Sequence, residues 1–408
     1  MAKDIKLSKK ELEVLCSIYR FRFLSQKQIA ALHFRNNNKI AKEYCRKVLS
    51  KMKNQKKLVL SERLNKETII YTLTRAGLKY VVNSLCLESY NTVSQLKIKE
   101  NNLEHQLYLN EFVITATSFL KDGSYKYYDE KDVCTLFNGV RPDGIIETDK
   151  AFYFIENDMG TERMNSLHDK WNKYRQFYTG SYINYNIDKP IIILFVLNNK
   201  EVLRRAKSIY KTIEISFLDV VSPNFDIVIG DTKELTNYMY CKENNLSKVN
   251  EIRQNLQKSK FCCDSGTFSD FGGYSFDLYS RLLNENRKIV KINGECIEYV
   301  LDDCFFMTCS TIKKVKMLES INYNFNEKHH RSIKYILVFK DYKHLLDFSN
   351  AYNLIGLPNI YFTTFERLRM MPIHKAAVAI DMYNNIFNFT DASLKCREFL
   401  VEKEFKIS

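Results

Sequence analysis

Long apolar runs are missing from the 408-residue sequence, and none approaches the roughly 18–20 residues that a membrane-spanning helix needs. Residues 1–6 also lack the apolar core of a signal peptide, so the sequence predicts a cytoplasmic protein with no membrane partner. No Cys-x-x-Cys pair or Cys/His quartet has zinc-binding spacing. The eleven cysteines, which include the adjacent Cys262 and Cys263, are therefore predicted to be reduced thiols. Only five prolines occur beside 26 tyrosines and 27 phenylalanines, a composition typical of an AT-rich genome rather than of one function.

Positive charge is concentrated at the start of the chain. Residues 1–80 contain 20 Lys and Arg against 6 Asp and Glu, and this excess equals the net charge of +14 for all 408 residues. The other 328 residues are therefore neutral overall. A chain of this length is too long for one hydrophobic core, so we expect two or three domains. We expect the polyanion-binding surface in the N-terminal domain.

The first 60 residues contain the start signals of three helices. Ser8 followed by Glu11 predicts a capping box, and Ser25 predicts the cap of a short helix. Residues 36–38, all Asn, predict the turn to a third helix at about residues 39–55. The residues predicted to pack inward from the third helix are Ala41, Tyr44, Cys45, Val48 and Met52. The cations outside that stripe are Lys39, Lys42, Arg46, Lys47 and Lys53.

A predicted hairpin follows the three helices. Residues 58–60 and 69–73 are apolar and flank the polar turn Asn65-Lys66, and residues 74–77 open another helix. Together these elements predict a winged helix-turn-helix at residues 1–82, and their order resembles the DNA-binding domains of bacterial and plasmid regulators. In that geometry the third helix enters the major groove and the wing contacts phosphates. The groove-facing candidates are Lys39, Lys42 and Arg46, and the wing candidates are Arg63 and Lys66. Lys47 and Lys53 are two further candidates for DNA contact. The alternative is that a lysine-rich helix is only a solvated face.

Acidic residues gather at a second predicted hairpin in the middle of the chain. If Asp149-Lys150 forms its two-residue turn, Asp143 lies directly opposite Glu156. Asp158 falls on the same face as Glu156, because side chains alternate along a strand. Three carboxylates among apolar neighbours repel one another, and a divalent cation removes that repulsion. We therefore predict Mg²⁺ ligation by Asp143, Glu156 and Asp158.

Residues 100–240 read as an α/β domain with a mixed sheet, after a polar linker at residues 83–99. Its first helix, at about residues 100–120, carries His105, which we interpret as a structural residue beside an apolar stripe. The later predicted elements are a strand at 124–128, a helix at 161–178, a buried strand at 190–197, a helix at 200–210, and strands at 215–218 and 226–229.

Residues 260–408 predict a C-terminal α/β domain. A strand at 333–339, a helix at 342–352 and a strand at 359–364 repeat the strand-helix-strand pattern of the preceding domain, which is compatible with a degenerate second copy. Asp302-Asp303 is its one acidic candidate. The glycines of residues 266–273 are spaced too loosely for a phosphate loop and predict a cluster of turns.

Several of these segments together resemble the replication-relaxation family of plasmid and mobile-element proteins. They are the winged helix, the helix with His105, Arg141-Pro142-Asp143-Gly144, residues 156–162, and residues 170–174 ahead of the next strand. The resemblance covers about residues 8–230. It implies a winged helix followed by a domain similar to the PD-(D/E)xK nuclease fold, with double-stranded DNA as the partner.

The resemblance also implies roles for the acidic residues. In an active nuclease of that fold, an Asp and a Glu hold Mg²⁺, and a Lys two residues after the Glu stabilises charge on the phosphate. Asp143 and Glu156 match the first two positions, but Asp158 occupies the place of the Lys. The cation would then have to come from Lys170 or Lys173 on the following helix.

The sequence leaves three functions open. The first is a double-stranded DNA-binding protein that acts at a plasmid or mobile-element origin, in replication initiation or in DNA relaxation and mobilisation. The second is a Mg²⁺-dependent endonuclease with Asp143, Glu156, Asp158 and Lys170 as catalytic residues. The third is a transcriptional regulator whose α/β part serves assembly, which the size of the C-terminal region disfavours. The expected partners are DNA, a second copy of the chain in a homodimer, and replication or relaxosome proteins.

Overall fold

The computed structural model describes residues 6–34, 39–121, 123–130, 132–133, 137, 139–181, 189–198, 201–292, 295–306, 308–352, 359–380 and 386–388. The predicted turn at residues 36–38 lies outside these ranges. The chain separates into two compact units, residues 1–161 and 162–408. Both units combine helices with sheets, which confirms the predicted mixed α/β fold class. Of the helices within these ranges, none combines the length and apolar character that crossing a membrane requires.

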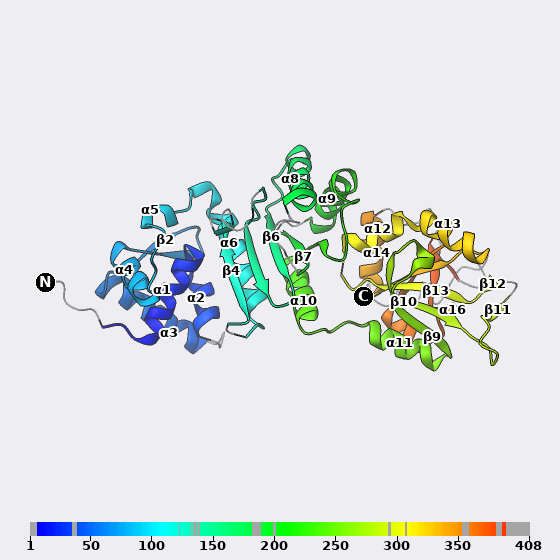
Figure 1. Ribbon diagram of the computed structural model, residues 1–408. Helices are drawn as coiled ribbons and strands as arrows, with labels where there is room; N and C mark the ends of the chain where they lie inside the picture. Colours follow the sequence, from blue (N-terminus) through cyan, green and yellow to red (C-terminus); the bar gives the residue numbers. More distant parts are fainter. Residues whose placement is uncertain are drawn as a thin grey trace. The chain divides into compact units, whose positions relative to one another are not determined.

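The first unit begins with helices packed around a small antiparallel sheet (Figure 1). Its elements are α1 (Lys9–Phe21), β1 (Leu24–Ser25), α2 (Gln26–His33), α3 (Lys39–Ser50), the π-helical turn η1 (Lys51–Gln55), β2 (Val59–Arg63), β3 (Ile69–Leu73) and α4 (Arg75–Leu85). The strand order is β1-β3-β2. The three predicted helices and the predicted hairpin are confirmed.

Reciprocal capping fixes where the first two helices begin. The Ser8 hydroxyl accepts the backbone N–H of Glu11 at 3.3 Å, and the Glu11 carboxylate accepts the N–H of Ser8 at 2.8 Å. Ser25 and Gln28 form the same pair of hydrogen bonds at the start of α2. Each capping box satisfies two backbone N–H groups near the start of its helix, so both predicted starts are confirmed.

The buried face of α3 differs from the predicted stripe at one aromatic residue. Cys45 and Leu49 of α3 and Met52 of η1 are fully buried, whereas Tyr44 is 56% exposed. The prediction that Tyr44 packs inward is therefore wrong. Leu49 lies four residues after Cys45 and continues the apolar row on the same side of the helix, which turns Tyr44 towards solvent.

The first unit continues with a helix and an antiparallel meander. Its elements are α5 (Val93–Leu96), the 3-10 turn η2 (Glu100–Asn102), α6 (Leu103–Thr117), β4 (Tyr125–Asp129), β5 (Gly144–Thr148) and β6 (Phe152–Asp158). Strand β5 pairs antiparallel with β4 and with β6. The predicted strand at 124–128 and the predicted central hairpin are confirmed.

Polar contacts join α6 and β4 to the helices at the start of the unit. The buried Asn110 amide of α6 donates to the carbonyls of Phe21 at 3.3 Å and Phe23 at 2.8 Å. Arg22, between these two residues, forms an ion pair with Asp129 of β4 at 2.9 Å, and both side chains are largely buried. These contacts fix α1 and β1 relative to the meander.

The second unit begins with two parallel strands and their covering helices. Its first elements are α8 (Met164–Gln176), the π-helical turn η3 (Phe177–Ser181), β7 (Ile191–Leu197), α9 (Val202–Ser216), β8 (Phe225–Gly230) and α10 (Thr232–Glu243). Every residue of β7 and β8 is buried, which confirms the predicted buried strand. The strand predicted at residues 215–218 is wrong, because α9 continues to Ser216. Ile209 and Ile213 extend its buried stripe to that point.

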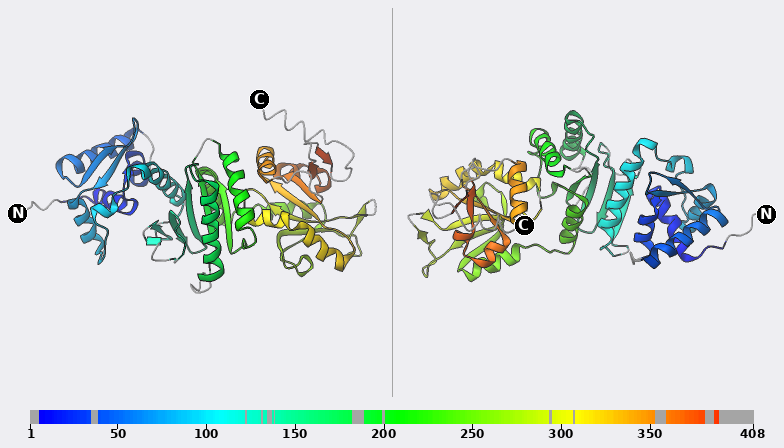
Figure 2. Two further views of the ribbon diagram at one scale, coloured as in Figure 1. Left: turned by 90° about the horizontal axis from the view of Figure 1, so that it is seen from above. Right: turned by 180° about the vertical axis from the view of Figure 1, so that it is seen from behind.

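The rest of the second unit is built on a mixed sheet (Figure 2). Its elements are α11 (Val249–Lys258), β9 (Phe261–Thr267), the 3-10 turn η5 (Ser269–Phe271), β10 (Ser275–Leu282), β11 (Lys291–Ile292), β12 (Glu295–Cys296), β13 (Glu298–Asp303), α12 (Cys309–Lys316), α13 (Leu318–His329), β14 (Lys334–Phe339), α14 (Tyr342–Tyr352), β15 (Ile360–Thr364), α15 (Phe365–Met370), α16 (Ile373–Ala376), β16 (Val378–Ile380) and β17 (Ile386–Asn388).

The strands of this sheet run in the order β17-β16-β15-β14-β13-β10-β9. The pairings of β13 with β14 and of β14 with β15 are parallel, and the other pairings in the described sheet are antiparallel. The predicted strand-helix-strand segment at 333–364 is confirmed. The predicted turn cluster at 266–273 is confirmed for its later part, where the 3-10 turn η5 is followed by Gly272 and Gly273 at φ angles of +66° and +81° that favour glycine. Its first two residues, 266–267, instead end strand β9.

Candidate nucleic-acid interface and acidic residues

All seven basic residues predicted to contact DNA are exposed at the surface of the first unit. Lys39, Lys42, Arg46 and Lys47 lie on α3, Lys53 on η1, Arg63 at the end of β2, and Lys66 in the β2–β3 turn. Arg46 pairs with Glu43 of the same helix at 2.8 Å, with both side chains exposed. Water screens such a pair strongly, so the guanidinium stays available to a more highly charged partner.

The turn between β2 and β3 has a fixed backbone. The Asn65 side-chain oxygen accepts the backbone N–H groups of Glu67 at 3.0 Å and Thr68 at 2.8 Å. The backbone N–H of Leu64 donates to the carbonyl of Thr68 at 2.9 Å. These bonds close the hairpin around the exposed Lys66, and the Lys53 ammonium donates to Ser61 of β2 at 2.6 Å. The hairpin is therefore connected to the end of the basic helix.

One cation near α3 has a structural role. Lys56 forms an ion pair with Glu11 at 2.8 Å, and Glu11 is only 3% exposed. Burial raises the pKa of Glu11, but hydrogen bonds from Lys56 and Ser8 outweigh it and hold the pKa below its usual value. Lys56 therefore compensates a buried charge, which separates it from the exposed cations of α3.

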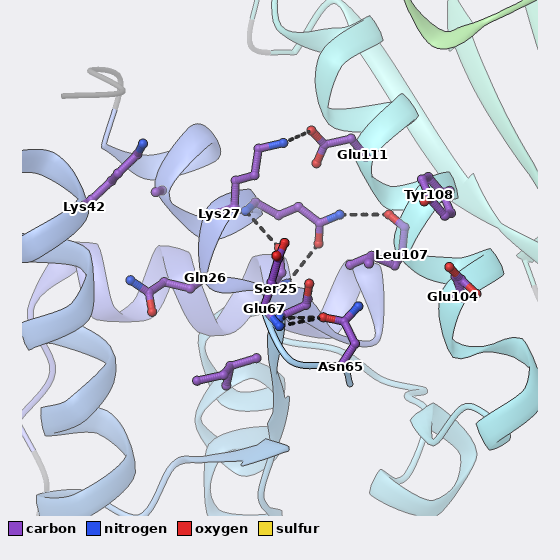
Figure 3. A pocket seen from close by; sticks show the side chains of 14 residues that line it. Ser25, Gln26, Lys27, Lys42, Asn65, Glu67, Glu104, Leu107, Tyr108 and Glu111 are labelled. Atoms are coloured by element: carbon purple, nitrogen blue, oxygen red, sulfur yellow. Dashed lines mark hydrogen bonds and ion pairs between the residues drawn. The ribbon is translucent and has the colours of Figure 1, made fainter. Parts of the chain in front are cut away.

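An open cleft of about 710 Å³ lies beside this surface in the first unit (Figure 3). Its walls are the start of α2, Lys42 of α3, the β2–β3 turn and α6. Two contacts join α2 to α6 across it: Lys27 pairs with Glu111 at 3.1 Å, and the Gln28 amide donates to the Leu107 carbonyl at 2.9 Å. The lining mixes both signs of charge, and these contacts hold α2 in position.

The acidic hairpin has the predicted register. Gly144 is paired with Ile155 and Ile145 with Phe154, and the Thr148 N–H donates to the Ala151 carbonyl at 3.0 Å around the two-residue turn. Continuing this register places Asp143 opposite Glu156, as predicted. The Asp143 carboxylate accepts the backbone N–H of Asn157, the residue after Glu156, at 2.8 Å.

His105 of α6 is joined to the same strand. Its Nε2 atom lies 2.9 Å from the Asn157 carbonyl and 3.3 Å from the Asp143 carboxylate. A carbonyl can only accept, so Nε2 carries the proton. The Asn157 amide donates in return to the His105 carbonyl at 3.0 Å. These reciprocal bonds agree with the structural role predicted for His105.

The predicted metal ligands are placed on adjacent strands, and two of them are deeply buried. Glu156 and Asp158 are 3% and 2% exposed, whereas the Asp143 side chain is 26% exposed. Among the residues that the structure describes, no group of three or more His, Cys, Asp and Glu side chains is arranged to hold a metal ion. Mg²⁺ ligation by Asp143, Glu156 and Asp158 stays a prediction.

Lys170, the predicted catalytic cation, lies on α8 in the second unit. Its ammonium pairs with Glu162 at 3.0 Å and lies 5.4 Å from the centre of the Phe195 ring. Lys173, the alternative, is exposed on the same helix. Lys170 is therefore paired with a carboxylate from the segment that precedes its own helix.

A second acidic pair, which includes a residue that the sequence did not reveal, lies in the second unit. Leu278 of β10 is paired with Leu301 of β13, and this register sets Asp277 opposite Asp302. The Asp277 carboxylate accepts the backbone N–H of Asp303 at 2.7 Å, and the Asp302 carboxylate accepts the N–H of Asp277 at 2.9 Å. Asp302-Asp303 stood out in the sequence, but Asp277 did not, because no short turn joins β10 to β13.

Lys314 of α12 compensates the second acidic pair. It forms an ion pair with Asp302, which is 1% exposed and also accepts the hydroxyl of Tyr335. Burial lowers the pKa of Lys314, but the charges of Asp302 and Asp277 outweigh it and raise that pKa above its usual value. Burial and the charge of Asp302 raise the pKa of Asp277 to about 6. Burial raises the pKa of Asp303 to about 7.

One family model matches part of the chain. Residues 15–189 match the family model described as Replication-relaxation, which confirms the resemblance predicted from the sequence over that segment. No curated protein and no solved structure matches the chain.

Proposed function

We propose that this protein binds double-stranded DNA through residues 1–82 and acts at an origin of a plasmid or mobile element, in replication initiation or in DNA relaxation and mobilisation. The match of residues 15–189 to the Replication-relaxation model supports the cellular process. The main support for DNA binding is that all seven predicted contact residues are exposed. They lie in a segment whose excess of positive charge equals the net charge of the whole chain. A homodimer on a repeated site, with replication or relaxosome proteins as further partners, belongs to the same proposal.

The order of elements supports a winged helix-turn-helix. Helices α1, α2 and α3 precede the β2–β3 hairpin. In the proposed domain α3 is therefore the recognition helix, and the turn around Lys66 is the wing. Cations on these elements neutralise phosphates and release condensed counterions, so affinity falls steeply with salt. Base edges in the major groove then supply sequence preference.

We propose that the acidic hairpin serves assembly rather than DNA cleavage. The Asp143 carboxylate accepts the Asn157 N–H and lies beside the His105 ring, and Lys170 pairs with Glu162. An endonuclease is the second candidate, because the register does bring Asp143 opposite Glu156. In that case a bound Mg²⁺ would supply Lewis-acid activation of the phosphate, with Asp143, Glu156 and Asp158 holding it.

A binding experiment tests the first proposal. Affinity for duplex DNA carrying the gene's own flanking sequence is measured at several salt concentrations for the intact protein, Lys42→Glu and Lys233→Glu. Lys233 is exposed on α10, outside the proposed interface, and its replacement changes the net charge equally. We expect tight, salt-sensitive binding that Lys42→Glu weakens more than tenfold, by analogy with the loss of a phosphate or base contact. Equal effects of the two variants would refute the interface.

A cleavage experiment separates the two candidates. Supercoiled and linear DNA are incubated with Mg²⁺, with Mn²⁺ and with chelator, using the intact protein and Asp143→Ala. We expect no nicking in any arm and unchanged binding by Asp143→Ala. Metal-dependent nicking that disappears in Asp143→Ala would make the protein an endonuclease.

A further inference from the structure

Two large apolar side chains are exposed on the most basic helix of the protein. Ile40 is 78% exposed and Tyr44 is 56% exposed, and they lie four residues apart on one side of α3. The Tyr44 ring packs edge-on against Phe34, with 5.5 Å between ring centroids, which orients it. The opposite side of the helix carries the buried Cys45 and Leu49. Apart from the contact between the Tyr44 and Phe34 rings, these two side chains form an apolar surface that is exposed to solvent.

The charges around this surface decide which partner fits it. Lys39, Lys42, Arg46 and Lys47 are exposed on the same helix. Docking a second copy through α3 would bring two sets of like charges together, which is unfavourable. A duplex supplies the complementary charge through its phosphates. In its major groove the one apolar group at a base edge is the C5-methyl of thymine.

We propose that Ile40 and Tyr44 contact thymine methyl groups in the major groove and so give the protein a preference for A·T base pairs at defined positions. This inference rests on the proposed DNA-binding function and names the bases that the same surface recognises. The cations of α3 contact phosphates and set the position of the helix, and the two apolar side chains carry sequence discrimination.

A chemical substitution on the DNA tests the proposal directly. Preferred duplexes are first selected from a random library with the intact protein. Each thymine is then replaced by uracil, which removes only the methyl group, and dissociation constants are measured. We expect a loss of about three- to tenfold at one or two adjacent positions, the range for removing a buried methyl contact.

Protein variants measured on the thymine and uracil duplexes form a double-mutant cycle between protein and DNA. Ile40→Ala should weaken binding to the thymine duplex by about the same factor and should become insensitive to uracil at one position. Tyr44→Phe keeps the ring and should behave as the intact protein. Tyr44→Ala should become insensitive to the replacement of thymine by uracil at a second position. Lys47→Ala is the matched control: it should weaken all duplexes alike and reduce the salt slope by about one. Both apolar side chains are exposed, so their replacement should leave the fold intact.

The outcomes distinguish two failures. If the intact protein binds duplexes but ignores uracil at every position, or if Ile40→Ala weakens thymine and uracil duplexes equally, the methyl contact is refuted and DNA binding stands. If no duplex is bound in a salt-sensitive manner, the proposed function itself fails.

Discussion

Asp143 and Asp277 occupy corresponding positions in two antiparallel strand pairs of one chain, β5–β6 and β10–β13. The carboxylate of each accepts the backbone N–H of the residue that follows the opposed acid: Asn157 at 2.8 Å for Asp143, and Asp303 at 2.7 Å for Asp277. The pairing registers place Glu156 and Asp302 opposite them. The two strand pairs therefore share one pattern of hydrogen bonds, and the degenerate second copy suggested by the strand-helix-strand segments stays a prediction.

The two strand pairs differ in the partner of the lysine on the helix that follows them. Lys314, on the helix that follows β13, forms an ion pair with the buried Asp302. Lys170, on the helix that follows β6, pairs with Glu162. Because Lys314 already compensates the acidic pair of Asp277 and Asp302, that pair does not need a metal ion to neutralise it. We therefore interpret the β10–β13 acidic pair as structural.

Removing Lys314 should destabilise the second unit strongly. Lys314→Met leaves the 1%-exposed Asp302 without its cation, and breaking a buried pair from one side costs about 3–5 kcal/mol. Lys316→Met is the matched control, since Lys316 pairs with the half-exposed Glu214 and should change stability by less than about 1 kcal/mol. Urea unfolding followed by the fluorescence of Trp171, the single tryptophan, measures both. Equal small effects would show that Asp302 is not held by this ion pair.

Raised pKa values predict the direction in which stability changes with pH. Asp303 has a pKa of about 7 in the folded protein, against a usual value of 3.8. The folded state therefore binds a proton that the unfolded state has released, and its stabilising effect is complete below about pH 4 and is lost as pH rises towards 7. The loss is on the order of 4 kcal/mol at most.

Asp303→Asn tests that pH dependence. The amide stays uncharged at all pH values and can still accept the N–H of Phe305, which Asp303 accepts at 3.0 Å. We expect the variant to be more stable than the intact protein at pH 8 and to lose part of the decline between pH 4 and 7. Parallel stability curves for the two proteins would contradict the assignment to Asp303.

The acidic pair of the β5–β6 hairpin could be predicted from the sequence, and that of β10 and β13 could not, for a physical reason. Asp149 and Lys150 form a two-residue turn, so the opposed pairs could be counted outward to Asp143 and Glu156. The connection from β10 to β13 spans residues 283–297 and includes β11 and β12, so counting from a turn gave no register for Asp277.

Side-chain exposure on α3 was harder to predict than the helix itself. The exposed cations and the helix boundaries followed from charge and spacing, but Tyr44 has an apolar ring and a polar tip and fits either side of a stripe. Tyr44 lies on the exposed side because Leu49 packs with Cys45 in the buried row, which only the tertiary structure shows. The exposure of Ile40 had no sequence signal, since Ile is an ordinary core residue.

The ion pair between Arg22 and Asp129 should hold the two parts of the first unit together. Asp129→Ala leaves the largely buried Arg22 guanidinium without this carboxylate and should lower stability by about 3 kcal/mol or more. Glu111→Ala removes the more exposed pair with Lys27 and should cost less than about 1 kcal/mol. Thermal unfolding of the intact chain measures both, and limited proteolysis shows whether the first unit opens. Similar midpoints for the two variants would contradict the role of Asp129.

Lys42 and Lys56 should separate DNA binding from stability within one basic region. Lys42 is exposed on α3, so Lys42→Ala should leave unfolding unchanged and reduce the slope of log affinity against log salt by about one. Lys56 pairs with the buried Glu11, so Lys56→Ala should destabilise the first unit and leave the salt slope of the folded protein nearly unchanged.

Glu11 has a lowered pKa, and the stability that it contributes is present near neutral pH and is lost as pH falls through that pKa. The difference in the free energy of unfolding between the intact protein and Lys56→Ala should therefore decrease under acidic conditions. Affinity measured at several salt concentrations, beside urea unfolding at pH 7 and at pH 4, provides all four comparisons. A loss of salt slope in Lys56→Ala, or a loss of stability in Lys42→Ala, would show that the two cations do not have separate roles.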